Sequence, residues 1–347
     1  MADITVARIA ILRRPSERTV PLYAALVASN LLAWAWAIAA FHGLPVLMGA
    51  AALAYAFGLR HAVDADHIAA IDNVTRKLMR EGRRPISVGL WFSLGHSTVV
   101  VLACAGIAMT SATLRAHLAG LKETGSLVGT AVSAAFLVFI ALANIAALVP
   151  VWHEFRRVRA GAAGPHANIE ARGPAPGIVG RVLRPLLRFV SAPRDMFLVG
   201  FLFGLGFDTA SEIGLLGISA SQAAPHAPLW PIMVFPALFA AGMSLVDTTD
   251  GVAMTGAYGW AFAKPERKLL YNFAITLLSI LAALFVGGLE TLNLLGAHGH
   301  WSGRFWHWIA ASNVHFGLLG CAIITAALGL WGISVLVSRL CVEPAER

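Results

Sequence analysis

The sequence predicts an all-α integral membrane protein with eight transmembrane helices, and three observations lead to this fold class. Only 13% of the 347 residues are charged, whereas a soluble protein carries about 25%. Hydrophobic residues make up 58% of the chain, and they are gathered into long blocks. Eight blocks are long enough for a spanning helix, which needs roughly 20 apolar residues. They cover residues 22–42, 45–71, 87–110, 126–150, 196–218, 231–256, 269–293 and 313–337. This blocking disfavours the alternative, a large soluble helical protein.

The first block, 22–42, follows a short basic segment with four arginines. A cleavable signal peptide would have a shorter apolar core and a small-residue cleavage site. We therefore expect 22–42 to be a retained first helix.

The basic residues predict the orientation of the chain. Of the 26 Lys and Arg residues, 22 fall in the N-terminal segment, in the C-terminal tail and in the loops 72–86, 151–195 and 257–268. The alternate loops hold only Arg115, Lys122 and Arg304. Because cytoplasmic loops are rich in Lys and Arg, we expect a multi-pass protein of the cytoplasmic (inner) membrane with both termini in the cytoplasm. The net charge of +8 is then a topology signal, and no basic and aromatic pattern indicates a nucleic-acid partner.

The domain organisation is predicted to be a single membrane domain over 1–347. Residues 1–150 would hold helices 1–4, 151–195 a cytoplasmic loop rich in Arg, Gly, Pro and Ala, and 196–347 helices 5–8. Three cysteines are too few for a disulfide framework. An assembly of several copies is compatible with this organisation.

Ionisable residues inside the apolar blocks are concentrated in four of the eight predicted helices. Such residues are costly in a bilayer and usually face a bundle interior or a transport pathway. They are Arg60, His61, Asp64, Asp66 and His67 in 45–71, His96 in 87–110, Asp208 and Glu212 in 196–218, and Asp247 and Asp250 in 231–256. We expect them to share one interior site.

The segment 45–71 is the richest of the four. At about 100° per residue, His61, Asp64 and His67 occupy an arc of about 120° on one helix face. Asp66 falls off that face in a regular helix. Either Asp66 has another role, or the helix is distorted so that His61, Asp66 and His67 converge.

The mixture of imidazole and carboxylate ligands suits a divalent late first-row metal such as nickel or cobalt. A purely carboxylate site would point to magnesium or calcium, and no soft Cys or Met ligand indicates Cu(I). The alternative for the 45–71 residues is a solvated helix terminus, and Asp72 and Asn73 are expected to be terminus residues. Histidines on the opposite side, such as His298 and His300, could gather metal or be ordinary surface residues.

Two pairs of segments predict an inverted repeat. "FGLRHAVDADHI" at 57–68 can be laid on "FGLGFDTASEIG" at 203–214, and "GHSTVV" at 95–100 on "GMSLVD" at 242–247. The spacing between the matched glycines is nearly the same in both copies. Helices 2–3 would then correspond to helices 5–6 with opposite orientation, an arrangement typical of secondary transporters.

Four segments together resemble the nickel/cobalt transporter (NiCoT) family of membrane permeases. They are "RHAVDADHI" at 60–68, "FSLGHSTVV" at 92–100, "LGFDTASE" at 205–212 and "GMSLVDTTDG" at 242–251. The resemblance implies high-affinity uptake of Ni²⁺, Co²⁺ or both as transported substrate, with no resident cofactor. It implies that His61, Asp66 and His67 form the metal-selecting core and that the polar residues of the other three segments line the route. Val63 stands where members vary between Val and Phe, which favours nickel.

Rival functions lack their signatures. The sequence has no phosphate-binding loop and no His-Glu-x-x-His protease motif, so we expect neither an ATPase nor an intramembrane metalloprotease. A membrane component that docks an ATP-driven partner stays open as the alternative.

Overall fold

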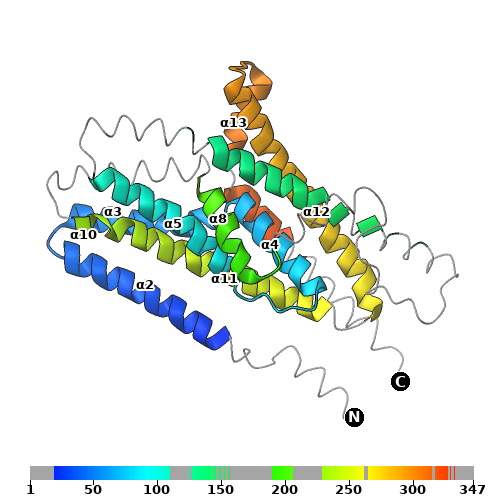
Figure 1. The fold of residues 1–347 in the computed structure, drawn as a ribbon, viewed down its shortest axis with the longest axis horizontal. Helices are drawn as coiled ribbons and strands as arrows, with labels where there is room; N and C mark the ends of the chain where they lie inside the picture. The colour runs from blue at the N-terminus through cyan, green and yellow to red at the C-terminus, as the bar shows by residue number, and fades with distance from the viewer. Residues whose placement is uncertain are drawn as a thin grey trace, which may run out of the picture.

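The computed structural model is all-helical over the residues that it describes. These are 19–109, 127–142, 190–205, 229–261, 265–314 and 317–326, with a few isolated positions between them. The main helices are α2 (Thr19–Phe41), α3 (Pro45–His61), α4 (Ala65–Arg80), α5 (Val88–Met109), α8 (Met196–Gly204), α11 (Val234–Ala261), α12 (Pro265–His298) and α13 (Arg304–Val314). Figure 1 shows α2, α3, α5 and α11 side by side, with α12 and α13 projecting from the bundle.

Three helices within the described residues are long and apolar enough to cross a membrane: Thr19–Phe41, Val88–Ala105 and Thr276–His298. Two bent helix pairs, Pro45–His61 with Ala65–Arg80 and Arg304–Ser312 with Gly317–Ala326, bring the number to five if each pair is one span. The described part of the chain therefore supports a multi-pass membrane protein.

The predicted helix 45–71 differs from the structure in its shape and its length. It is broken at residues 62–64, and the two halves, α3 and α4, are bent by 50°. The second half continues to Arg80, so the predicted loop 72–86 is largely helical and Asp72 and Asn73 lie inside a helix. The expectation that these two residues end the helix was wrong. Arg76, counted as a loop charge, is completely buried, because its helix packs inside the bundle.

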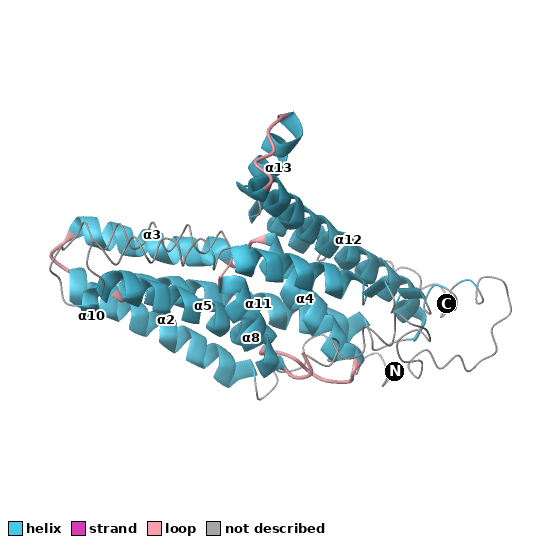
Figure 2. Ribbon diagram, turned by 45° about the horizontal axis from the view of Figure 1, so that its top comes forward, coloured by secondary structure: helices cyan, strands magenta, loops and turns pink. Residues whose placement is uncertain are grey.

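The last described helices also depart from the prediction. The helix predicted at 269–293 extends to His298, and α13 precedes the predicted block 313–337. In both ribbon views α13 lies against the end of α12, and this end stands away from the rest of the bundle (Figures 1 and 2). The exposed aromatic side chains of α13, Phe305 and Trp308, are of the kind enriched at a membrane interface.

Two apolar clusters form the core. One unites α4, α5, α8, α12 and the helix 127–142 around residues such as Phe92, Leu137 and Phe203. The other unites α2, α3, α5 and α11 around Phe41, Phe235 and Phe239. Helix α5 contributes to both, so it joins the two halves of the bundle.

A capping contact fixes the start of the short 3-10 helix η2 (Pro193–Asp195), which directly precedes α8. The Asp195 carboxylate accepts hydrogen bonds from the backbone N–H groups of Ser191 at 2.7 Å and Ala192 at 2.8 Å. Slight burial works to raise the pKa of Asp195, but these hydrogen bonds outweigh it and hold the pKa below its ordinary value.

Candidate metal centre

The break in the predicted second helix creates the centre. The backbone N–H groups of Val63 and Asp64 donate to the carbonyls of Arg60 and His61, both at 3.0 Å, which tightens the end of α3. Asp64 then has extended backbone angles (φ −65°, ψ 145°) and starts α4. The resulting bend turns the first turn of α4 back toward the end of α3, so His61 and His67 no longer lie on one straight face.

Three histidines converge at this break. The rings of His61, His67 and His96 lie with their centroids 4.7–4.8 Å apart. One ligand atom from each falls within 4.8 Å of the others. No other such group of three His, Cys, Asp or Glu residues was found among the described residues. All three side chains are at most 2% exposed, which rules out a solvated helix terminus.

Two carboxylates orient the imidazoles. His61 Nδ1 lies 3.3 Å from Asp64 Oδ2, and His67 Nδ1 lies 3.3 Å from Asp247 Oδ1. The carboxylates lie on the Nδ1 sides of these two rings, and His61 Nε2 is 3.0 Å from His96 Nε2. A carboxylate behind a ligating histidine fixes the ring orientation and raises its basicity.

The His67 Nε2 atom is the clearest sign of a ligand. It is buried and has no hydrogen-bond partner within the described part of the chain. A buried polar atom in this state is rare and needs an explanation such as an ion. Three imidazoles, two of them backed by carboxylates, fit a late first-row dication.

Close backbone contact between α5 and α11 occurs at Asp247, the residue whose side chain lies 3.3 Å from His67. A Cβ on Gly89 would lie 1.9 Å from the Asp247 carbonyl oxygen, so only glycine lets α5 and α11 approach this closely. Phe92 stacks edge-on against His67 with centroids 4.8 Å apart, and Phe239 lies 5.6 Å from His61. These rings form apolar walls around the histidines.

The predicted site residues therefore divide into groups. His61, His67 and His96 meet, with Asp64 and Asp247 directly behind two of them. Asp66 lies in the first turn of α4, where its Oδ1 atom is buried without a hydrogen-bond partner. Asp250 lies one helical turn beyond Asp247. Asp208 and Glu212 fall outside the described residues.

Sequence reasoning missed two buried polar groups. One surrounds Asp72. The sequence pattern that could have revealed it is Arg76, four residues later, where a helix places an ion-pair partner. The other is Glu290 on α12, which is 7% exposed and accepts hydrogen bonds from Ser133 Oγ at 2.9 and 3.1 Å. Glu290 was visible as the one acid of the block 269–293, a block treated as nearly free of charge.

Comparisons with known proteins agree with this geometry. The model of the NicO family, described as "High-affinity nickel-transport protein", matches residues 47–337. The chain is 51% identical to a "High-affinity nickel transport protein" of Cupriavidus necator, over 94% of this chain and 93% of that one. It is 40% identical to the "Nickel transporter NicT" of Mycobacterium tuberculosis, over 91% and 87%. It is 39% identical to the "Cobalt transport protein NhlF" of Rhodococcus rhodochrous, over 85% and 84%.

No solved structure matches the chain. The family model matches most of the chain, the matches to the relatives extend over most of their length, and the buried histidine triad lies at the family's motif. This chain therefore belongs to the nickel/cobalt transporter (NiCoT) family of multi-pass membrane proteins.

Proposed function

We propose that this nickel/cobalt transporter carries Ni²⁺ or Co²⁺ into the cytoplasm by alternating access and binds it in transit at His61, His67 and His96. The observation that carries the proposal is the buried convergence of these three rings with an unpartnered His67 Nε2. Asp64 and Asp247 act behind the ligands and neutralise part of the dication's charge. Asp66, Asp208, Glu212 and Asp250 line the route.

The membrane potential supplies the energy for this uptake. Moving one charge across 100 mV changes its free energy by about 2.3 kcal/mol, so a dication moving inward gains about 4.6 kcal/mol. Because a tenfold ratio corresponds to about 1.4 kcal/mol, this sustains an inward gradient on the order of 10³. A secondary transporter therefore suffices, without ATP hydrolysis.

The proposal includes eight spans in one permease domain, with both termini in the cytoplasm and helices 2–3 related to helices 5–6 by an inverted repeat. Glycine packing supports the repeat. In the pair α3–α11, a Cβ on Gly58 would lie 2.1 Å from the Phe239 carbonyl oxygen. In the pair α5–α8, a Cβ on Gly95 would lie 1.9 Å from the Phe197 carbonyl oxygen. Helix 2 (α3) thus packs on helix 6 (α11), and helix 5 (α8) packs on helix 3 (α5). An inverted repeat that relates helix 2 to helix 5 and helix 3 to helix 6 requires these two packing contacts to be equivalent.

Uptake of radiolabelled nickel by cells that express His61→Ala tests the site. We expect uptake to be lost while the variant still reaches the membrane, because one of three ligands and the partner of Asp64 disappear together. His307→Ala, an exposed histidine outside the triad, is the matched control and should transport normally. Wild-type uptake by His61→Ala would refute the ligand assignment.

The same assay separates the autonomous transporter from a component of an ATP-driven complex. Cells that express this chain alone should accumulate nickel, and dissipating the membrane potential should reduce the accumulation. No accumulation without a partner protein would favour the complex.

A further inference from the structure

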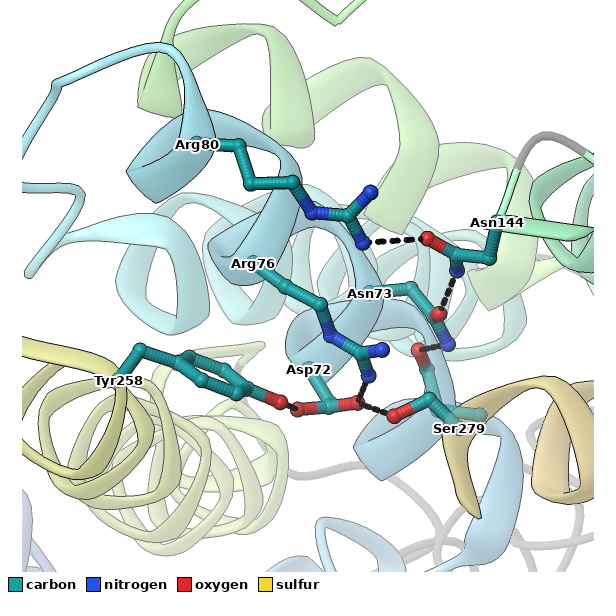
Figure 3. Close-up of polar contacts among 8 residues, drawn as sticks. Asp72, Asn73, Arg76, Arg80, Asn144, Tyr258 and Ser279 are labelled. Carbon is teal, nitrogen blue, oxygen red and sulfur yellow. Dashed lines mark hydrogen bonds and ion pairs between the residues drawn. The ribbon is translucent and has the colours of Figure 1, made fainter. Parts of the chain in front are cut away.

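A second buried polar cluster lies along α4 beyond the histidines. Asp72 accepts hydrogen bonds from Arg76 Nη2 at 2.7 Å, from Ser279 Oγ at 2.5 Å and from the Tyr258 hydroxyl. The donors come from α4, α12 and α11, so the Asp72 carboxylate is the point where three helices meet (Figure 3). Asp72 is 4% exposed and Arg76 is completely buried.

Arg76 is poorly satisfied for a buried cation. Its Nε and Nη1 atoms have no hydrogen-bond partner among the described residues, and its guanidinium carbon lies 5.4 Å from the Tyr258 ring centroid. A buried ion pair gives little net stability even when its hydrogen bonds are complete, and apolar residues of similar volume often do better. The pair therefore calls for a function rather than a stabilising role.

The second cluster is continuous with the metal centre. Asp72 follows His67 by five residues, about 7.5 Å along α4. On α11, Asp250 follows Asp247 by one turn. The next residue, Gly251, packs on α4 beside Asp72, where an added Cβ would lie 3.6 Å from the Ile71 side chain. The Asp250 Oδ2 atom is buried and has no hydrogen-bond partner within the described residues. Carboxylates thus connect the histidine triad to Asp72.

We propose that Asp72 and Asp250 form a second binding site for the transported dication, and that the Arg76 guanidinium occupies the Asp72 carboxylate when no metal is there. The inference rests on the proposed transport function and adds a second binding site along the transport route. A dication that leaves the triad would displace Arg76 from Asp72, and the return of Arg76 would release the dication toward the end of α4. An internal cation that competes for the same oxygens keeps this site weak, so the metal is not trapped.

The control for this proposal lies one turn further along α4. Arg80 carries the same charge, but its Nη2 donates to the neutral Asn144 side chain at 2.9 Å, so it does not compete for Asp72 (Figure 3). Removing the charge of Arg76 and removing that of Arg80 should therefore have different effects on metal binding.

The experiment measures bound nickel per protein by equilibrium dialysis of the purified full-length chain in detergent. Wild type and Arg80→Gln should hold one nickel, and Arg76→Gln should hold two. The double variant Asp72→Asn/Arg76→Gln should return to one. Arg76→Gln combined with His61→Ala should keep one nickel, because only the triad is damaged.

Where wild type holds one nickel, two results would overturn the inference: one nickel in folded Arg76→Gln, or two nickels in Arg80→Gln as well. If Arg76→Gln does not fold, Arg76→Met replaces it, since Met also removes the charge and apolar residues of similar volume are tolerated in place of a buried ion pair. Arg76→Met should bind a second nickel at a concentration at which wild type holds one, and failure to do so is also contrary to the inference. If wild type binds no nickel, the result contradicts the histidine site and not the second site. In that case, one nickel bound to Arg76→Gln would support the second site.

Discussion

At the scale of single residues, the centre depends on which nitrogen of each imidazole is engaged. Asp64 and Asp247 each lie 3.3 Å from an Nδ1 atom, and we therefore propose Nε2 as the ligating nitrogen of His61 and His67. The pattern of the sequence placed Asp64 with the two histidines, whereas the resemblance stressed Asp66. In the structure Asp64 contacts His61, and the role of Asp66 stays a prediction.

Asp247→Asn should weaken metal binding without removing a ligand. The amide keeps the shape of the carboxylate but loses the charge that orients His67 and raises its basicity, so we expect a loss of affinity of roughly 10- to 100-fold. Titration of purified protein with nickel measures this loss directly.

Glu81→Gln is a suitable control for Asp247→Asn, because Glu81 is exposed at the end of α4. It should bind nickel as wild type does. Unchanged affinity in Asp247→Asn would mean that the carboxylate does not act through His67.

At the scale of elements, glycines decide how closely the helices approach. Helix α3 touches the backbone of α11 at Gly58, and α5 touches that of α11 at Gly89. Small residues at helix interfaces allow this backbone contact, and in a bilayer such packing replaces the hydrophobic effect as the source of association. The triad exists because these contacts hold α3, α5 and α11 together around the break.

Gly58→Ala should destabilise the bundle. The added Cβ would fall 2.1 Å from the Phe239 carbonyl oxygen, and because backbone lies on both sides, the helices must move apart. Overpacking of this kind costs about 1–3 kcal/mol, so the melting temperature of the purified protein should fall by several degrees and nickel uptake should decline.

Gly49→Ala provides the matched control in the same helix, since nothing lies within 4 Å of its added Cβ. It should melt at or above the temperature of wild type, because alanine favours the helix over glycine. Equal melting temperatures for both variants would contradict the packing argument.

At the scale of the whole molecule, polar residues far apart in the sequence form one buried line. It comprises the histidine triad, Asp247 and Asp250 on α11, and Asp72 on α4. We propose that this line is the part of the bundle where a dication meets charge of the opposite sign. The excess of Lys and Arg in alternate loops predicts that the Arg80 end of α4 faces the cytoplasm.

The orientation makes a prediction for fusion proteins. A fluorescent protein fused to the C-terminus should fluoresce, and alkaline phosphatase at the same position should be inactive, because the C-terminus would be cytoplasmic. Fusions in the segment 111–123, between helices 3 and 4, should give the opposite pair of results. An active C-terminal phosphatase would reverse the orientation and the direction assigned to the route.

The sequence alone determined the class of this protein and most of its chemistry. Long apolar blocks with few charges predict membrane helices, and the ionisable residues within them identified His61, His67 and His96, because such residues are too costly in a bilayer to lack a purpose. Only the tertiary structure decided how these residues meet. The break at 62–64 cannot be seen in the helical period, since it depends on packing against neighbouring helices. The burial of Asp72 and Arg76 was also hidden, because two charges one turn apart at the end of an apolar block are equally typical of a solvated helix end. Their partners, Tyr258 and Ser279, come from distant segments that only folding brings together.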